Sequence, residues 1–183
     1  MATATQTPTG VTTWKIDPTH THVEFAVKHM MITTVKGRFS GVTGEIRLDE
    51  AQLASSKVDI EIDAATIDTR DSQRDTHLRS GDFFDVEQYP KITFRSTSVE
   101  GTLESFKLNG ELTIRGVSRP ITLDVTHEGR GKDPWGGERI GFTATGKLNR
   151  KEFGLNWNAA LETGGFLVGE DVKITLDVEA VKA

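Results

Sequence analysis

Two histidines, His20 and His22, stand two positions apart after an Asp-Pro pair and are the first candidates for chemistry. In an extended segment, side chains two positions apart point to the same side, and Glu24 continues that row. Two histidines placed in this way bind zinc when a third ligand arrives from elsewhere in the fold, and His29 or His77 could supply it. A metal-dependent or acid–base enzyme is therefore one hypothesis. The alternative is a hydrogen-bonded strand edge without bound metal, and we adopt that interpretation.

A second candidate lies between residues 68 and 79, where basic side chains alternate with carboxylates. The basic members are Arg70, Arg74, His77 and Arg79, and the acidic members are Asp68, Asp71 and Asp75. The basic group could hold a phosphate at the start of a short helix. The carboxylates could equally neutralise it by ion pairing on a solvated surface, which is the arrangement that we expect. No nucleophile elbow, phosphate-binding loop or dinucleotide fingerprint occurs, so we expect no catalytic residue and no cofactor.

Composition narrows the class of protein further. The 183 residues include 22 basic and 27 acidic side chains, a net charge of −5, and no cysteine. The lack of cysteine excludes disulfides and thiol chemistry, and an acidic chain without a Lys/Arg run is not expected to bind nucleic acid. No apolar run is long enough to span a bilayer. The N-terminus lacks the basic and apolar regions of a secretory signal, so we expect a cytoplasmic protein.

Most of the chain alternates apolar and polar residues with a period of two, which is typical of half-buried strands. We interpret residues 1–13 as a disordered tail, residues 14–183 as one domain and the short apolar run 30–37 as one helical turn. About eight strand segments follow one another, joined by short turns, which indicates an antiparallel sheet. Gly37, Gly41 and Gly44 interrupt one long strand and are interpreted as bulges or bends that let the sheet curl. We therefore predict an all-β fold, an eight-stranded antiparallel barrel rather than a sandwich.

The stretch from Ala65 to Phe94 is the one long interruption of this strand pattern. Asp71 can cap a short helix there, Asp75 can pair with Arg79 one turn later, and Gly81 can end the helix. We therefore predict a short helix between two strands.

The predicted helix has one apolar residue, Leu78, so it cannot bury a full face. It must lie on a surface or over an opening, anchored by Leu78 and by the following Phe83 and Phe84. One hypothesis is a lid, which we define as residues 71–84, closing the end of the sheet over a ligand. The alternative is a surface crossover between two strands, and the residues of this stretch by themselves favour it.

Aromatic side chains dominate the apolar positions, with nine Phe and three Trp against one Tyr. An eight-stranded barrel has an interior that side chains fill or that one small ligand occupies, and the sequence leaves both open. If the barrel is hollow, the expected lining residues are Phe25, Val27, Phe39, Ile60, Phe83, Phe84, Phe94, Leu112, Ile114, Leu123, Phe142 and Leu176. The candidates for contact with a ligand head group at the mouth are His22, Arg74 and His77.

Five motifs cover nearly the whole chain from Trp14 to the last strand. They are W-x-I-D-P-x-H with F-x-V-x-H (residues 14–29), G-R-F (37–39), A-T-I-D-T…R-D-x-H-L-R-S-x-D-F-F-D…Y-P-x-I-T-F (65–94), G-E-L-T-I-R-G-V-S-R-P-I-T-L (110–123) and N-R-x-x-F-G-L (149–155). With these motifs the chain resembles the YceI family of lipocalin-like, polyisoprenoid-binding proteins. Met30-Met31 stands where relatives commonly carry Leu-Gly, so we expect the tunnel to differ in shape near that turn.

The resemblance implies an extended lipocalin-like barrel whose apolar interior binds, and transports or stores, a polyisoprenoid or a similar long-chain amphiphile. It also implies a non-enzymatic protein without catalytic residues, often dimeric, so a homodimer is an expectation here. Many relatives carry an export signal that this sequence lacks. Two rival functions stay open: the enzyme using the His20 and His22 region, and a stress-related interaction module whose barrel is filled.

Overall fold

The structure is a computed structural model that describes residues 10–183, so the part of the expected tail before Gly10 lies outside the described residues. The strands are β1 (Val11–Ile16), β2 (His22–His29), β3 (Thr33–Phe39), β4 (Val42–Asp49), β5 (Lys57–Asp63), β6 (Lys91–Thr102), β7 (Ser105–Ile114), β8 (Val117–Lys132), β9 (Glu138–Asn149) and β10 (Val168–Lys182). One α-helix, α1 (Ser72–Arg79), and three short 3-10 turns, Leu53–Ser55, Ala64–Thr66 and Arg150–Phe153, join them. Among the residues described, no helix has the length and apolar composition needed to cross a bilayer.

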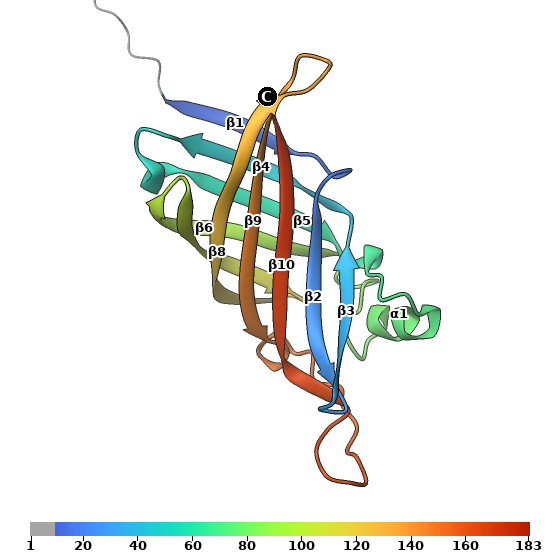
Figure 1. Ribbon diagram of the computed structural model, residues 1–183. Coiled ribbons are helices and arrows are strands. Elements are labelled where there is room, and N and C mark those ends of the chain that lie inside the picture. The colour runs from blue at the N-terminus through green and yellow to red at the C-terminus, as the bar shows by residue number, and fades with distance from the viewer. Residues whose placement is uncertain (1–9) are drawn as a thin grey trace, which may run out of the picture.

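The strands form one antiparallel sheet in the order β1-β4-β5-β6-β7-β8-β9-β10-β2-β3. An additional pairing of β1 with β10 closes β1 and β4 to β10 into a ring of eight strands (Figure 1). The predicted eight-stranded antiparallel barrel is therefore confirmed. The β2–β3 hairpin is an extension of this ring that the sequence pattern did not separate from it.

Strand β10 determines how the barrel closes, because two different strands share one of its edges. Its C-terminal end pairs with β1, as in Ile16 opposite Ala180, and the rest of that edge pairs with β2, from His22 opposite Asp177 onward. We call the part of the barrel around the β1 pairing the β1 half and the part around the β2 pairing the β2 half. In the β1 half, β1 also pairs with β4, so the barrel wall there is continuous. In the β2 half, the outer edge of β3 meets the chain after β5 through a single bridge, Arg38 to Asp68. The segment containing α1 therefore lies beside β3, on the side of the barrel rather than across its end (Figure 1).

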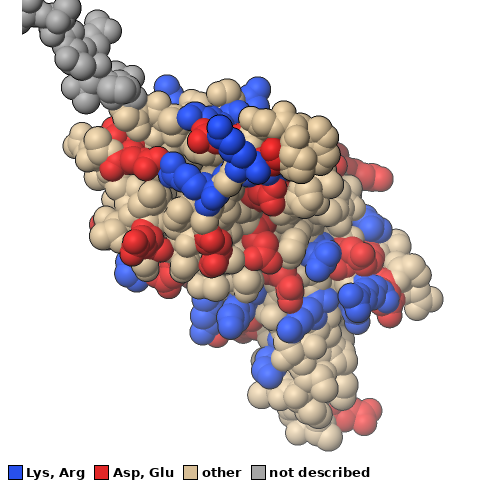
Figure 2. Space-filling view, turned by 45° about the horizontal axis from the view of Figure 1, so that its top comes forward, with Lys and Arg blue, Asp and Glu red and all other residues tan. Residues whose placement is uncertain are grey.

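The β1 half of the barrel is filled with side chains. Trp14, Val42, Ile140 and Ala180 are each at most 1% exposed, which is the close packing typical of a protein interior. The Trp14 ring lies under two cations, with Arg130 5.8 Å and Lys182 6.0 Å from its centroid. On the face drawn in Figure 2, acidic and basic side chains are interspersed, in agreement with the lack of a Lys/Arg run.

Two local expectations need correction at the ends of β1 and β2. The disordered tail expected over residues 1–13 extends too far, because residues 11–13 belong to strand β1 and pair with β4. The run 30–37 does not form a helical turn. Met30 and Met31 have positive φ values of 51° and 61° and make the turn of the β2–β3 hairpin.

The one long strand expected through Gly37, Gly41 and Gly44 is two strands, β3 and β4, with Gly41 between them, and Gly44 lies in an unbroken register opposite Ile60. Gly37 likewise marks no bulge, because it lies in an unbroken register opposite Phe25. A Cβ at this position would lie 2.4 Å from Cζ of Phe25, so glycine is required by the ring that rests on it. Irregularities of register occur instead at 96–98, 127–129 and 168–172. Such bulges increase the local twist of a strand and help a sheet to close.

Candidate ligand-binding cavity

The β2 half of the barrel encloses a cavity of about 450 Å³. Its walls come from β2, β3 and β5 to β10, from the segment that contains α1 and from the chain between Arg150 and Val168. A volume of this size lies within the range of small-molecule sites in proteins. The barrel is therefore filled in one half and hollow in the other.

Period-two alternation places the apolar side chains of the central strands toward the cavity. Ile60 of β5 stands opposite Phe94 of β6, and Phe94 stands opposite Leu112 of β7, so these three residues form one row across the wall. The intervening residues Asp59 and Glu111 are exposed on the outer surface. The inward side chains are apolar and the outward side chains are charged, as the alternation predicts.

Aromatic rings form the wall where the β2–β3 hairpin meets the α1 segment. The Phe25 ring lies 5.7 Å from that of Phe39, and the Phe39 ring contacts Phe84 edge-on at 5.6 Å. Edge-on and tilted pairs at such distances are the favoured aromatic geometries. Phe84 therefore connects the lid segment to the strands on the cavity side.

Hydrogen bonds to the backbone hold α1 in place. Asp71 caps the helix by accepting from the Arg74 amide at 3.0 Å, as predicted. The predicted Asp75–Arg79 ion pair is wrong. Asp75 is buried and accepts from the amide and hydroxyl of Thr69, at 2.9 and 2.5 Å. Arg79 donates to the carbonyls of residues 65 and 67, and the helix ends at Arg79, with Ser80 rather than Gly81 as its C-cap.

The ion pairs expected among residues 68–79 are replaced by contacts of Arg74 and Arg79 to uncharged oxygens and of His77 to a carboxylate outside that range. Arg74 donates from Nε to the Thr69 hydroxyl and from Nη2 to the Thr69 carbonyl, both at 2.7 Å. His77 contacts Asp82 at 2.8 Å. The His77 ring also packs edge-on against Phe83 at 5.2 Å and against Trp157 at 4.6 Å. Trp157 therefore joins α1 to the chain that follows β9.

Every predicted lining residue borders the cavity except Phe142. Phe142 lies nearer the filled half, where its ring packs 6.1 Å from Phe106 and 5.4 Å from His127. Of the head-group candidates, Arg74 and His77 border the cavity and His22 does not. His22 is paired with Asp177, 3.3 Å away.

Several lining residues were not predicted. Ile62, Ile92, Ile121, Val172 and Ile174 carry the same period-two signal as their predicted neighbours, so that signal could have found them. Arg150, Leu155, Trp157, Leu167 and Val168 lie in a stretch without periodicity, and no pattern pointed to their direction.

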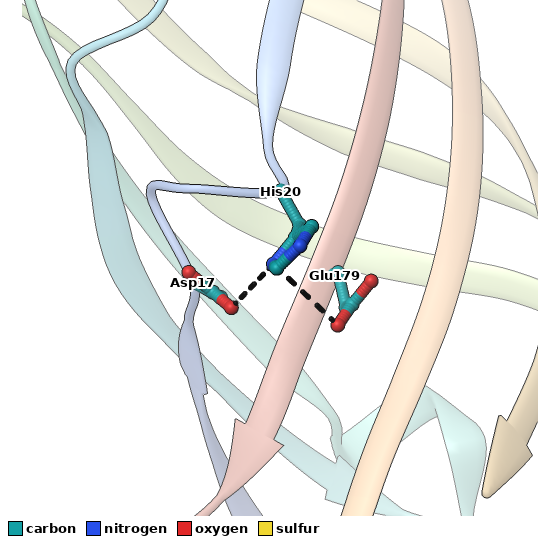
Figure 3. Close-up of side chains that lie close together, drawn as sticks. All are labelled: Asp17, His20 and Glu179. Carbon is teal, nitrogen blue, oxygen red and sulfur yellow. Dashed lines mark hydrogen bonds and ion pairs between the residues drawn. The ribbon is translucent and has the colours of Figure 1, made fainter. Parts of the chain in front are cut away.

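The histidines of the enzyme hypothesis are not brought together. His20 lies 2.9 Å from Asp17 and 3.9 Å from Glu179, outside the cavity (Figure 3). His77 borders the cavity on α1, and His22 has its own partner. Within residues 10–183, the group of side chains with metal-ligand spacing is Asp17, His20 and Glu179.

Arg139 already supplies a cation to that group. Its guanidinium donates to Asp17 at 2.7 Å, to Glu179 at 2.8 Å and to Asp133 at 2.9 Å. Hydrogen bonds from His20 and Arg139 hold the pKa of Asp17 well below its usual range. In turn, the hydrogen bond to Asp17 and the charge of Glu179 raise the pKa of His20. The cluster is therefore a structural ion-pair network at the bend between β1 and β2.

Comparisons with known proteins agree with this architecture. The model of the YceI-like domain matches residues 14–180. A UPF0312 protein of Staphylococcus aureus (strain bovine RF122 / ET3-1) is 38% identical over 170 residues, covering 92% of this chain and 97% of that protein. The crystal structure of the Campylobacter jejuni YCEI protein, 34% identical, has a TM-score of 0.71 and covers 85% of this chain and 90% of its own.

A more distant structural neighbour shares the fold. It is a polyisoprenoid binding domain from Saccharophagus degradans, implicated in plant cell wall breakdown, with a TM-score of 0.67, 15% identity, and coverage of 93% of this chain and 98% of its own. The family match over nearly the whole barrel and the identity of the Staphylococcus relative lead to one conclusion. The chain belongs to the YceI family.

Proposed function

We propose that this protein binds a single long-chain apolar ligand, of the polyisoprenoid class or similar, inside the β2 half of the barrel. The observation that carries the proposal is the cavity itself, whose strand walls are aliphatic and aromatic. The description of the Saccharophagus neighbour as a polyisoprenoid binding domain points to the same class of ligand. The protein acts as a carrier or store of this ligand, not as an enzyme.

Burial of the chain alone can supply the affinity. Each buried CH2 group contributes about 0.8 kcal/mol, so ten such groups contribute about 8 kcal/mol. Association costs on the order of 4–15 kcal/mol in lost translational and rotational freedom. A chain of intermediate or greater length is therefore needed, and short apolar molecules bind weakly.

The rival functions receive less support from the geometry. A filled barrel does not describe the β2 half, which is hollow. An enzyme built on His20, His22 and His77 would need them in one site, but His77 borders the cavity and the other two do not, and of the three only His20 belongs to the group with metal-ligand spacing in residues 10–183. The homodimer that the resemblance implies stays a prediction, which light scattering of the purified protein tests.

Two substitutions on one strand test the proposal. Ile60→Trp places an indole in the cavity, whereas Asp59→Trp places the same group on the outer face of β5. We expect Ile60→Trp to lose binding of an uncharged fluorescent probe such as N-phenyl-1-naphthylamine, and Asp59→Trp to bind it like the wild type. Circular dichroism establishes that both variants are folded. Undiminished probe binding by a folded Ile60→Trp variant would remove the cavity as the binding site.

Mass spectrometry identifies the natural ligand. An organic extract of the protein purified from its own host should contain a long-chain amphiphile, and the Ile60→Trp variant prepared in parallel should lack it. An extract without any such molecule, together with no probe binding, would contradict the proposal.

A further inference from the structure

The ionisable side chains that border the cavity are all basic. They are Lys28, His29, Arg74, His77 and Arg150. Among the residues that the structure describes, no Asp or Glu side chain borders the cavity. The chain as a whole has more acidic than basic residues, with a net charge of −5. The sign of the charges that border the cavity is therefore opposite to the net charge of the protein.

Arg150 is the buried member of this set, with 3% of its surface exposed. Its guanidinium donates to four backbone carbonyls: those of Gly169 at 2.7 Å, Leu155 at 2.5 Å, Trp157 at 2.9 Å and Val168 at 3.2 Å. These bonds satisfy its geometry but leave its charge without a contacting carboxylate in the described chain. Burial accordingly lowers the pKa of Arg150. The charge of Glu170 offsets part of this effect, and a further anion nearby would favour the charged form of Arg150 in the same way.

Three of the other members also have charge or donors to offer. Arg74 uses Nε and Nη2 on Thr69, and in residues 10–183 no hydrogen bond from its Nη1 is found. Lys28 and His29 take part in no ion pair of the described chain. His77 is the exception, since Asp82 contacts it.

One length of chain joins the basic residues to one another. Val168 pairs with His29 across the sheet, and its carbonyl accepts from Arg150. The Trp157 carbonyl also accepts from Arg150, while its ring packs against His77. The end of β2, the chain after β9 and α1 thus meet around one end of the cavity. We call the five basic residues that they contribute the basic rim.

We propose that the ligand carries an anionic head group, a carboxylate or a phosphate, and that the basic rim holds it while the chain lies along the apolar walls. This inference rests on the proposed function and specifies the chemical class of its ligand. Arg74 supplies a donor, Nη1, for which no hydrogen bond is found in the described chain. Arg150 supplies positive potential from behind its carbonyls. Hydrogen bonds in which the donor or the acceptor is charged are about twice as strong as those between neutral groups.

Displacement of N-phenyl-1-naphthylamine by matched compounds tests the inference. The set is hexadecanol, hexadecanoic acid, hexadecyl phosphate and hexadecyltrimethylammonium, each below its micelle concentration, together with geranylgeraniol and geranylgeranyl phosphate. We expect the anionic member of each pair to displace the probe at a concentration ~10-fold or more below that of the alcohol. The ammonium compound should be the weakest. Comparison of the acid with the phosphate decides which anion the rim prefers.

Charge variants locate the effect. Arg74→Gln should reduce the preference for anionic over alcohol ligands, taken as a ratio within the same variant, to less than threefold. Arg70→Gln removes the same charge from an exposed residue that does not border the cavity, so its preference should equal that of the wild type. An unchanged preference in Arg74→Gln and in a second variant, His29→Gln, would overturn the assignment to the rim.

The outcomes separate this inference from the function on which it rests. Equal displacement by hexadecanol, the acid and the phosphate would overturn the anionic head group and leave the apolar carrier standing. No displacement by any compound, the alcohols included, would overturn both.

Discussion

Two phenylalanines on the same barrel should respond very differently to truncation. Phe94 and Phe142 are 5% and 6% exposed, and both point inward from central strands. Phe142 lies between other rings in the filled half, whereas Phe94 borders the cavity on one side. The pair therefore compares the same change, Phe→Ala, in a filled and in a hollow environment.

The expected magnitudes follow from what each ring touches. Phe142→Ala removes contacts on all sides and leaves a void, so it should lower the free energy of unfolding by roughly 3–5 kcal/mol. On its cavity side Phe94 already lacks packing partners, and atoms facing empty space gain no dispersion energy there. Phe94→Ala should therefore cost about 2 kcal/mol, mainly through lost contact with the backbone of Gly110 and with its strand neighbours.

Urea melts of the ligand-free variants measure these losses as changes of the midpoint at constant slope. Repeating the melts with a saturating apolar ligand adds a second contrast, because ligand stabilisation depends on affinity. Phe94→Ala should lose part of the ligand stabilisation, and Phe142→Ala should keep all of it. Equal losses of stability in the two variants, with equal ligand stabilisation, would refute the division of the barrel into a filled and a hollow half.

Four further results are expected. Gly37→Ala should cost about 1–3 kcal/mol, since its Cβ collides with the Phe25 ring, whereas Gly131→Ala, with no atom within 4 Å of the added Cβ, should cost well under that in the same urea melts. Asp75→Ala should cost about 1–3 kcal/mol because both donors of Thr69 lose their acceptor, and Asp75→Asn, which keeps an acceptor oxygen, should recover part of the loss. The pKa of His20 is raised in the folded protein, so its contribution to stability is fully present below its unfolded pKa and is lost as pH rises through the folded pKa. The difference in unfolding free energy between the wild type and His20→Gln should therefore be larger at pH 6 than at pH 9. A difference that does not depend on pH would contradict this. Amide exchange in residues 71–80 should slow when a prenyl ligand is added, while β10 is protected in both states, and a Phe83→Ser, Phe84→Ser double variant should release ligand faster; unchanged exchange and release would leave α1 as a plain crossover.

The sequence was sufficient to predict most of the strands and the inward faces of the central ones, although β3 and β4 were expected as one strand. Ile60, Phe94 and Leu112 each stand between polar neighbours, and only one face of such a strand can be buried. Closure into a ring and the glycine-rich strands were also predictable, although Gly37 turned out to accommodate a ring and not a bulge. These features depend on local alternation, which a single sequence records directly.

Features that depend on distant partners were not predictable. Asp75 accepts hydrogen bonds from Thr69, and Arg79 donates to backbone carbonyls, because the chain before α1 folds back against the helix. The spacing of residues within the helix does not predict these partners. The direction of Arg150 and Trp157 depends on the irregular chain around them, where no periodicity exists. The cavity does not extend as far as Phe142, because the end of β10 that pairs with β1 belongs to the filled half of the barrel.

The division of one sheet into two halves also bears on how such a chain diverges. Strand β10 passes through both halves, with Ala180 in the solid one and Ile174 in the hollow one. Substitutions around Ile174 would change the shape of the cavity, and so the ligand that it can accommodate, without changing the contacts of Trp14. Proteins accept most changes as long as total stability stays above a threshold. Ligand specificity can therefore change during evolution through a series of sequences that all remain folded. Protein design can change the size of the hollow half in the same way.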